Sequence, residues 1–199
     1  NFNAGKTREF FYFKNPNDGV YTGDTTTYSA TKRLRYFIDP QLTYFTPGGD
    51  RHRFSGRFFS VDNESDNNQT NTSQLYYGEY QFQKRWNTTG TVVTLGGVSS
   101  HVNSDAQLFG GNSFQLLNLA GYTQVEQPVG DRLNLSAGVR YEYNQIRSPD
   151  SVQISDTDRI PRVDQSEGKP VFRVGANYQA AEGTFLRASW GQGYRFPTL

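Results

Sequence analysis

The connections between the predicted strands of this chain alternate between short and long, and this alternation constrains the fold more than any other feature. Tight turns rich in Gly, Pro, Asn and Asp are expected at 47–50, 87–90, 128–131 and 180–183. Longer polar segments are expected at 15–30, 63–73, 104–112 and 147–168. The short turns therefore fall at one edge of a sheet and the long loops at the other, which is typical of an up-and-down barrel that spans a membrane.

The segments between these connections alternate polar and apolar residues with the period of a β-strand. In 132–144, Leu133 and Leu135 would take one face, and Arg140 and Glu142 the other. We expect eight to nine long strands, at 7–14, 31–46, 51–62, 75–86, 91–103, 113–127, 132–145, 170–180 and 184–194. A tilted strand needs about 9–11 residues to cross the hydrocarbon of a membrane, so most of these segments are long enough.

The composition agrees with an all-β membrane protein. Aromatic residues make up 15% of the 199 residues, yet only 34% of the chain is apolar and the mean hydropathy is −0.75. The formal net charge of +1 excludes a whole-molecule field that would attract nucleic acid. Cysteine is absent, which excludes thiol catalysis and Cys-based zinc sites. The predicted fold class is therefore an antiparallel up-and-down transmembrane β-barrel segment, with a small closed barrel of eight strands as the alternative.

Four segments also resemble one protein family in its order along the chain. The run 183–198 ends in Gly-Gln-Gly-Tyr-Arg-Phe-Pro-Thr, and it resembles a mid-barrel strand of TonB-dependent outer-membrane receptors. Similar likenesses lie at 119–124, 131–142 and 170–179. The chain is therefore similar to a TonB-dependent receptor of the Bacteroidetes type, firmly over 75–199 and loosely over 1–74.

The resemblance implies that residues 1–199 form part of the barrel domain of a longer receptor in the bacterial outer membrane. Receptors of this kind close about 22 strands around a plug domain, for which no segment is recognised here. The implied partners are outer-membrane lipid and lipopolysaccharide, the plug domain of the same parent chain, the coupling protein TonB, and a scarce nutrient such as an iron–siderophore complex. No enzyme activity and no cofactor are implied.

Polar residues of the alternating strands are the candidate site. Side chains on the polar faces would line the lumen or contact the plug, and we expect them to hold wall and plug together rather than to touch the cargo. These residues are Arg57, Glu79, Gln81, Gln83, Arg85, Gln124, Glu126, Arg140, Glu142, Arg173, Asn177 and Arg187. Recognition of the cargo is expected in external loops instead, at Leu108 and Phe109.

No constellation supports catalysis or a resident metal. His52 and His101 fall on different predicted strands, and we expect His52 to be a solvated turn residue. The acidic loop 147–168 lacks the ligand spacing of an EF-hand. Two other functions remain open on the sequence, a complete small outer-membrane barrel that acts as an adhesin or structural protein, and a secreted carbohydrate-binding β-sandwich.

Overall fold

A computed structural model describes residues 2–11, 29–66, 68–109, 112–148, 151–153 and 159–194, and these form almost nothing but strands. The strands are β1 (Phe2–Phe11), β2 (Ser29–Ile38), β3 (Gln41–Phe45), β4 (Arg51–Ser65), β5 (Asn71–Arg85), β6 (Val92–Ala106), β7 (Asn112–Val129), β8 (Leu133–Arg147), β9 (Val152–Gln153), β10 (Arg159–Ile160), β11 (Asp164–Ala181) and β12 (Thr184–Gly191). One 3₁₀ turn, η3 (Gln107–Phe109), follows β6. In this part of the chain no helix has the length and apolarity needed to cross a membrane.

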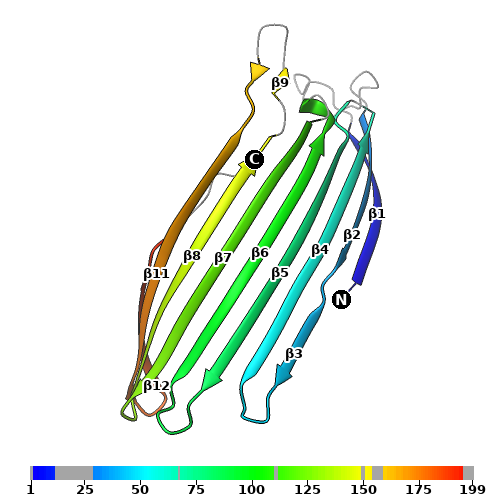
Figure 1. Ribbon diagram of the computed structural model, residues 1–199. Coiled ribbons are helices and arrows are strands. Elements are labelled where there is room, and N and C mark those ends of the chain that lie inside the picture. The colour runs from blue at the N-terminus through cyan, green and yellow to red at the C-terminus, as the bar shows by residue number, and fades with distance from the viewer. Residues whose placement is uncertain are drawn as a thin grey trace, which may run out of the picture.

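Ten of the strands form one antiparallel sheet in the order β1-β2-β4-β5-β6-β7-β8-β11-β12, with β3 paired to β4. Strands that follow each other in sequence lie side by side and tilt together (Figure 1). No ladder joins β1 to β12 in the described ranges, so the sheet is not closed. The predicted partial barrel wall is therefore confirmed, and the alternative of a small closed barrel is wrong.

The predicted strand 31–46 is interrupted near its middle. β2 ends at Ile38 and β3 begins at Gln41, and both pair with β4. The cause is Pro40, which has no N–H to donate to a ladder. Its carbonyl still accepts a hydrogen bond of 2.9 Å from the N–H of Gly56. One crossing of the sheet is thus built from two strands.

The strands reach further toward the long-loop edge than the sequence predicts. β4 runs to Ser65 and β6 to Ala106, into two segments expected as loops. β7 and β11 have 18 residues each. The sequence did not predict these extensions because their residues are polar. Polar residues can still extend a strand, since the hydrogen bonds of the ladder are made by backbone groups alone. The first strand also differs from its predicted bounds 7–14, since β1 begins at Phe2; the described residues of that region end at Phe11.

Glycines with positive φ form the tight turns at the short-turn edge of the sheet. Each of the four predicted short turns contains one glycine with positive φ, a conformation that side chains with a Cβ rarely adopt. The angles are 83° at Gly49, 71° at Gly90, 60° at Gly130 and 75° at Gly183. The turns therefore reverse the chain in a few residues at this edge, whereas the opposite edge carries the longer connections (Figure 1).

The register divides the side chains of the sheet between two faces. Paired residues on neighbouring strands point to the same side, and successive residues along a strand alternate. Nearly all the exposed large apolar side chains of the strands share one side, which we call the apolar face. They are Phe2, Leu34, Ile38, Leu42, Tyr44, Phe54, Tyr76, Tyr80, Leu95, Leu119, Val125, Val129, Leu135, Tyr141, Phe172, Val174, Tyr178, Leu186 and Trp190.

The other side, which we call the polar face, is concave and more crowded. Among the described strand residues, the buried side chains Val92, Thr94, Ala120, Asn144 and Ile146 lie on it, and Ser60 on the apolar face is the exception. Curvature explains this burial, because side chains on the inside of a bent sheet converge. A sheet with a polar inside and an apolar outside is the arrangement that a barrel wall needs in a membrane.

Candidate functional site

All twelve polar residues predicted as lumen or plug contacts lie on the polar face. The ladders connect them from strand to strand: Glu79 shares its face with Ser55 of β4 and Val98 of β6. Arg140 shares it with Tyr122 of β7. The complete set, spread over six strands and grouped by them, is Arg57 on β4, Glu79, Gln81, Gln83 and Arg85 on β5, Gln124 and Glu126 on β7, Arg140 and Glu142 on β8, Arg173 and Asn177 on β11, and Arg187 on β12. What these residues contact outside the chain stays a prediction.

One cavity of about 320 Å³ opens on the polar face near the short turns. Its floor is made of small residues, Ser136, Gly175 and Ser189. A Cβ at Gly175 would come within 2.8 Å of the Ser136 Oγ, so this glycine gives the hydroxyl its room. Lining residues from β7 and β12 face one another across the cavity, although these strands are three apart and ~14 Å distant along a flat sheet. The cavity therefore depends on the curvature of the wall.

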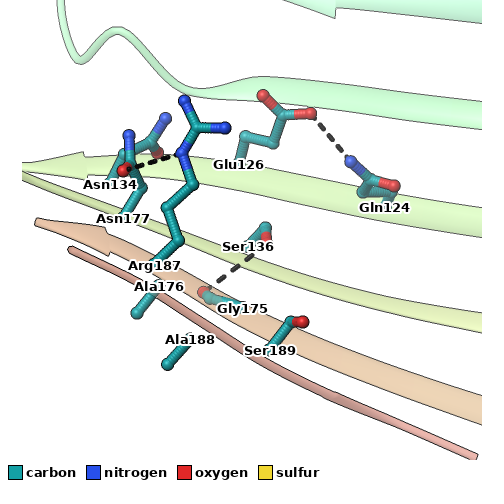
Figure 2. A pocket seen from close by; sticks show the side chains of 10 residues that line it. All are labelled: Gln124, Glu126, Asn134, Ser136, Gly175, Ala176, Asn177, Arg187, Ala188 and Ser189. Atoms are coloured by element: carbon teal, nitrogen blue, oxygen red, sulfur yellow. Dashed lines mark hydrogen bonds between the residues drawn. The ribbon is translucent and has the colours of Figure 1, made fainter. Parts of the chain in front are cut away.

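Charged and amide side chains form the rim of this cavity (Figure 2). Glu126 accepts a hydrogen bond of 2.7 Å from the Gln124 Nε2. The Arg187 Nε donates to the Asn177 Oδ1 at 3.4 Å. The carboxylate and the guanidinium thus each bind an amide, and no ion pair joins them among the contacts of the described residues. The rim offers both charges and several amides to a polar partner.

Glu79 is the centre of a second polar cluster. Its two carboxylate oxygens accept hydrogen bonds of 2.7 Å from the hydroxyls of Tyr77 and Tyr122. Tyr122 belongs to β7, two strands away, and its hydroxyl also accepts from the Gln81 Nε2 at 3.1 Å. The Tyr122 ring crosses β6 at Gly96, where a Cβ would come within 2.1 Å of the ring. Gly96 therefore allows the contact between the two strands.

Arginines of the polar face fall into two groups. Arg57 binds Asp39 through two bonds of 2.7 and 2.6 Å, and Arg140 binds Glu142 at 2.5 Å. Arg33 likewise binds Glu9 at 3.1 Å. The others have no carboxylate within ion-pair distance in the described part of the chain, and these are Arg35, Arg51, Arg53, Arg85, Arg173 and Arg187. The Nε of Arg51 is also buried without a hydrogen-bond partner there. The polar face thus presents more positive charge than it neutralises.

The sequence prediction did not select the residues that hold the Glu79 cluster together. Tyr77 has the same parity as Glu79 along β5, so alternation alone could have placed it on the polar face. Its contact, and that of Tyr122, could not be predicted, because both depend on side-chain geometry across strands. Asp39 was not selected either, because the sequence predicts an unbroken strand over 31–46 and gives no sign of the break at Pro40 beside it.

The predicted loop contacts and histidines have different outcomes. Leu108 lies in η3 at the long-loop edge and is 62% exposed, whereas the side chain of Phe109 lies outside the described residues. His52 is not a solvated turn residue, because it lies in β4 and its Nδ1 is 2.7 Å from the Tyr80 hydroxyl. No group of metal-ligating side chains gathers in the described ranges.

The comparison with protein families decides the identity of this two-faced sheet. The model of the family described as TonB dependent receptor-like, beta-barrel, matches residues 2–199. The chain belongs to this family. TonB-dependent receptors are transporters of the outer membrane of Gram-negative bacteria, and the family implies a plug domain and an interaction with TonB in the parent protein. Neither a curated protein nor a solved structure matches the chain significantly.

Proposed function

We propose that this chain is part of the barrel wall of a receptor that takes up an iron–siderophore complex, in energised transport coupled to TonB. The observation that carries the proposal is the division of the sheet into two faces, because lipid requires an apolar exterior and a plugged barrel has a polar interior. Membership in the family supports outer-membrane transport in general. The siderophore class, and the Bacteroidetes type of the receptor, come from the sequence resemblance.

In this proposal the polar face holds the plug domain of the parent chain. Six arginines without a carboxylate partner among the described residues would be costly inside a closed barrel unless acidic groups or water met them. The plug supplies such groups, and the amide rim around Glu126 and Arg187 supplies neutral hydrogen bonds beside them. The cargo is bound further out, at the loops that contain Leu108 and Phe109. Lipopolysaccharide and phospholipid cover the apolar face.

The transport proposal is tested in cells that carry the whole receptor gene. Uptake of ⁵⁵Fe bound to a panel of siderophores is compared between the parent strain, a receptor deletion and a TonB deletion. We expect uptake of at least one complex to fall to background in both deletions. Uptake of labelled cobalamin and of oligosaccharides serves as the matched comparison. If a deletion of the receptor abolishes one of those and leaves all iron complexes unaffected, the iron–siderophore proposal is wrong.

The role of the polar face is tested separately in the whole receptor. Arg187→Gln should lower the urea concentration at which the plug unfolds, because it removes a cation that faces the plug. Arg132→Gln is the control, since Arg132 is an exposed residue of a short turn. Cargo affinity should be the same in both variants. A fall in cargo affinity for Arg187→Gln, with normal plug stability, would place the cargo rather than the plug at this rim.

A further inference from the structure

One row of the polar face is apolar, and it runs across the sheet near the long-loop edge. Each residue of the row is the ladder partner of the next, so six strands contribute one side chain each. We call this row the inner belt, and it consists of Phe37, Phe59, Leu75, Val102, Leu116 and Ile146. Neighbouring strands lie about 4.8 Å apart, so the row is ~24 Å long on a flat sheet. In the next row toward the loops, Val61 and Phe114 are apolar and Ser73 and Ser104 are polar, so the inner belt is long and narrow.

The inner belt has no second layer of the described chain over it. Ile146 is 6% exposed, and the other five side chains are half-buried. Its polar neighbours bind each other: on the short-turn side the Asn118 Nδ2 donates to the Asn144 Oδ1 at 2.7 Å. On the loop side, the Asn63 Nδ2 donates to the Asn71 Oδ1 at 2.8 Å. A partner would therefore gain more by covering the apolar row than the polar rows around it, since uncovered apolar surface is unfavourable in water.

The inner belt lies at the level where the outer surface of the sheet changes from apolar to polar. On the apolar face, the residues one position nearer the short turns include Tyr76 and Leu117. Those one position nearer the loops on β5, β6 and β7 are polar, and they are Gln74, Asn103 and Gln115. The inner belt is therefore at the outer margin of the hydrocarbon, and it faces the lumen rather than lipid. Because long loops are extracellular in this architecture, it lines the outer mouth of the barrel.

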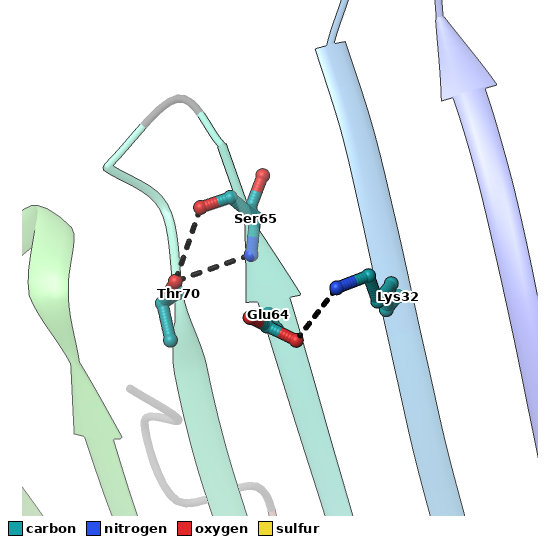
Figure 3. Close-up of polar contacts among 4 residues, drawn as sticks. All are labelled: Lys32, Glu64, Ser65 and Thr70. Carbon is teal, nitrogen blue, oxygen red and sulfur yellow. Dashed lines mark hydrogen bonds and ion pairs between the residues drawn. The ribbon is translucent and has the colours of Figure 1, made fainter.

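The proposed recognition surface adjoins the inner belt. Thr70, in the connection between β4 and β5, accepts a hydrogen bond of 3.1 Å from the Ser65 N–H and closes the edge there (Figure 3). The Thr70 carbonyl accepts another of 2.9 Å from the Gln107 N–H, which ties η3 and its exposed Leu108 to this edge. η3 follows directly after β6, whose last residue is four positions, or ~13 Å, beyond Val102 of the inner belt. A ligand held at η3 can therefore extend onto the inner belt.

Arg35 supplies positive charge at one end of the inner belt. It is exposed, and it lies two residues from Phe37 on the same face of β2. Its guanidinium has no carboxylate within ion-pair distance in the described ranges, whereas the neighbouring Arg33 binds Glu9. A Cβ at Gly5, the partner of Arg35 on β1, would come within 3.9 Å of the Arg35 Nε, so this glycine leaves room for the side chain. An apolar row with a cation at its end complements an amphiphilic anion.

We propose that the inner belt binds a fatty-acyl chain of the cargo, and that Arg35 binds a carboxylate beside the chain. This cargo class rests on the proposed function, which it narrows to the iron complex of an acylated siderophore. A flexible chain suits the row better than a compact ring system does, because it can lie along several strands. The cargo is chosen over the plug as the occupant because the inner belt adjoins η3 and lies at the extracellular end of the lumen.

The experiment uses the whole receptor in lipid nanodiscs, and empty nanodiscs measure how much of the acylated probe enters lipid. The probes are the ferric complexes of one citrate–hydroxamate siderophore with and without a lauroyl chain, and calorimetric titration gives their affinities. The wild-type receptor should bind the lauroyl complex at least about tenfold more tightly than the unacylated one, because burial of several methylene groups contributes. Equal affinities would overturn the proposal.

Substitutions in the inner belt test where the chain lies. Val102→Thr should weaken binding of the lauroyl complex about fourfold, which is the contribution of one buried methyl group. Adding Leu116→Asn should raise the loss to about 50-fold, whereas the unacylated complex should bind as it does to the wild type. Val98→Thr is the matched control, because Val98 lies on the same face of β6 but outside the inner belt. An equal loss in this control would overturn the proposal.

The carboxylate and the alternative occupant are tested with the same two complexes. Arg35→Gln should weaken both complexes about tenfold, because both carry the carboxylate, whereas Arg132→Gln should weaken neither. If the belt variants lower the urea concentration at which the plug unfolds and leave the affinity for the lauroyl complex unchanged, the plug is the occupant and the proposal is wrong. Binding of neither complex to the wild type would also overturn it. The siderophore proposal itself is decided separately, by iron uptake in the receptor deletion.

Discussion

The two faces of β5 show how one strand can present an apolar surface on one side and a polar surface on the other. Tyr76, Gly78 and Tyr80 lie on the apolar face, where Tyr76 and Tyr80 leave 46% and 48% of their surface exposed. One residue away along the chain, Tyr77 and Glu79 bind each other on the polar face. The apolar face is joined across strands by ring contacts, such as those of Phe58 with Tyr76, and it leaves large apolar side chains exposed for lipid to cover, whereas the polar face is cross-linked by hydrogen bonds between side chains of several strands. The faces should therefore respond in opposite ways to the same kind of substitution.

The largest difference is expected for a charge introduced on each face. Leu119→Arg puts a cation on the apolar face of β7 and should destabilise the folded receptor by about 2–4 kcal/mol in lipid. Gln124→Arg puts the same cation on the polar face of the same strand and should cost much less, because water or the plug can solvate it. Urea unfolding of both variants in lipid vesicles measures the difference. Equal costs would mean that lipid does not cover the apolar face.

A smaller effect is expected from a single methyl group on the polar face. Gly96→Ala would push the Tyr122 ring away and break its hydrogen bond to Glu79, which should cost about 1.5–3 kcal/mol. Gly78→Ala makes the same chemical change on the apolar face, where nothing lies within 4 Å of the new Cβ. Unfolding in urea should separate the two alanine variants, and a loss shared equally by both would point to β-propensity rather than to Tyr122.

A polar contact on the apolar face should contribute less to the free energy of unfolding than the Glu79 cluster does. Tyr80→Phe removes the hydroxyl that lies 2.7 Å from the His52 Nδ1, and a neutral hydrogen bond of this kind stabilises by about 0.5–1.5 kcal/mol. The unfolding midpoint should fall only slightly, with no change in transport. A loss larger than that of Gly96→Ala would show that the aromatic group around His52 holds the sheet more firmly than the Glu79 cluster.

The smallest effect on stability is expected outside both faces, at the loop edge. Leu108→Ala removes an exposed side chain of η3 and should change the free energy of unfolding by no more than about 0.5 kcal/mol. Cargo affinity, measured by titration of the whole receptor, should nevertheless fall, because the loops are the proposed recognition surface. Wild-type affinity in this variant would remove Leu108 from that surface.

The two faces could be predicted from the sequence, because side chains alternate between faces along each strand whatever strands lie beside it. All twelve polar residues accordingly lie on one side of the sheet. Contacts across strands were not predictable. Tyr122 reaches Glu79 only because Gly96 stands between them, and this depends on the register of three strands. The end of β4 was missed for another reason: its residues are polar on both sides, so no period marks them as a strand.

The length of the strands bears on where the cargo first meets the receptor. β7 and β11, with 18 residues each, measure ~60 Å along the chain, about twice what the hydrocarbon of the membrane requires even for a tilted strand. The surplus at the loop edge is paired on both sides along most of β7 and with β8 alone along β11, so it is a collar of ladders rather than a set of free loops. A nutrient would then enter through a mouth raised above the hydrocarbon of the membrane. Shortening the strands at that edge would lower the mouth toward the membrane surface without altering the barrel below.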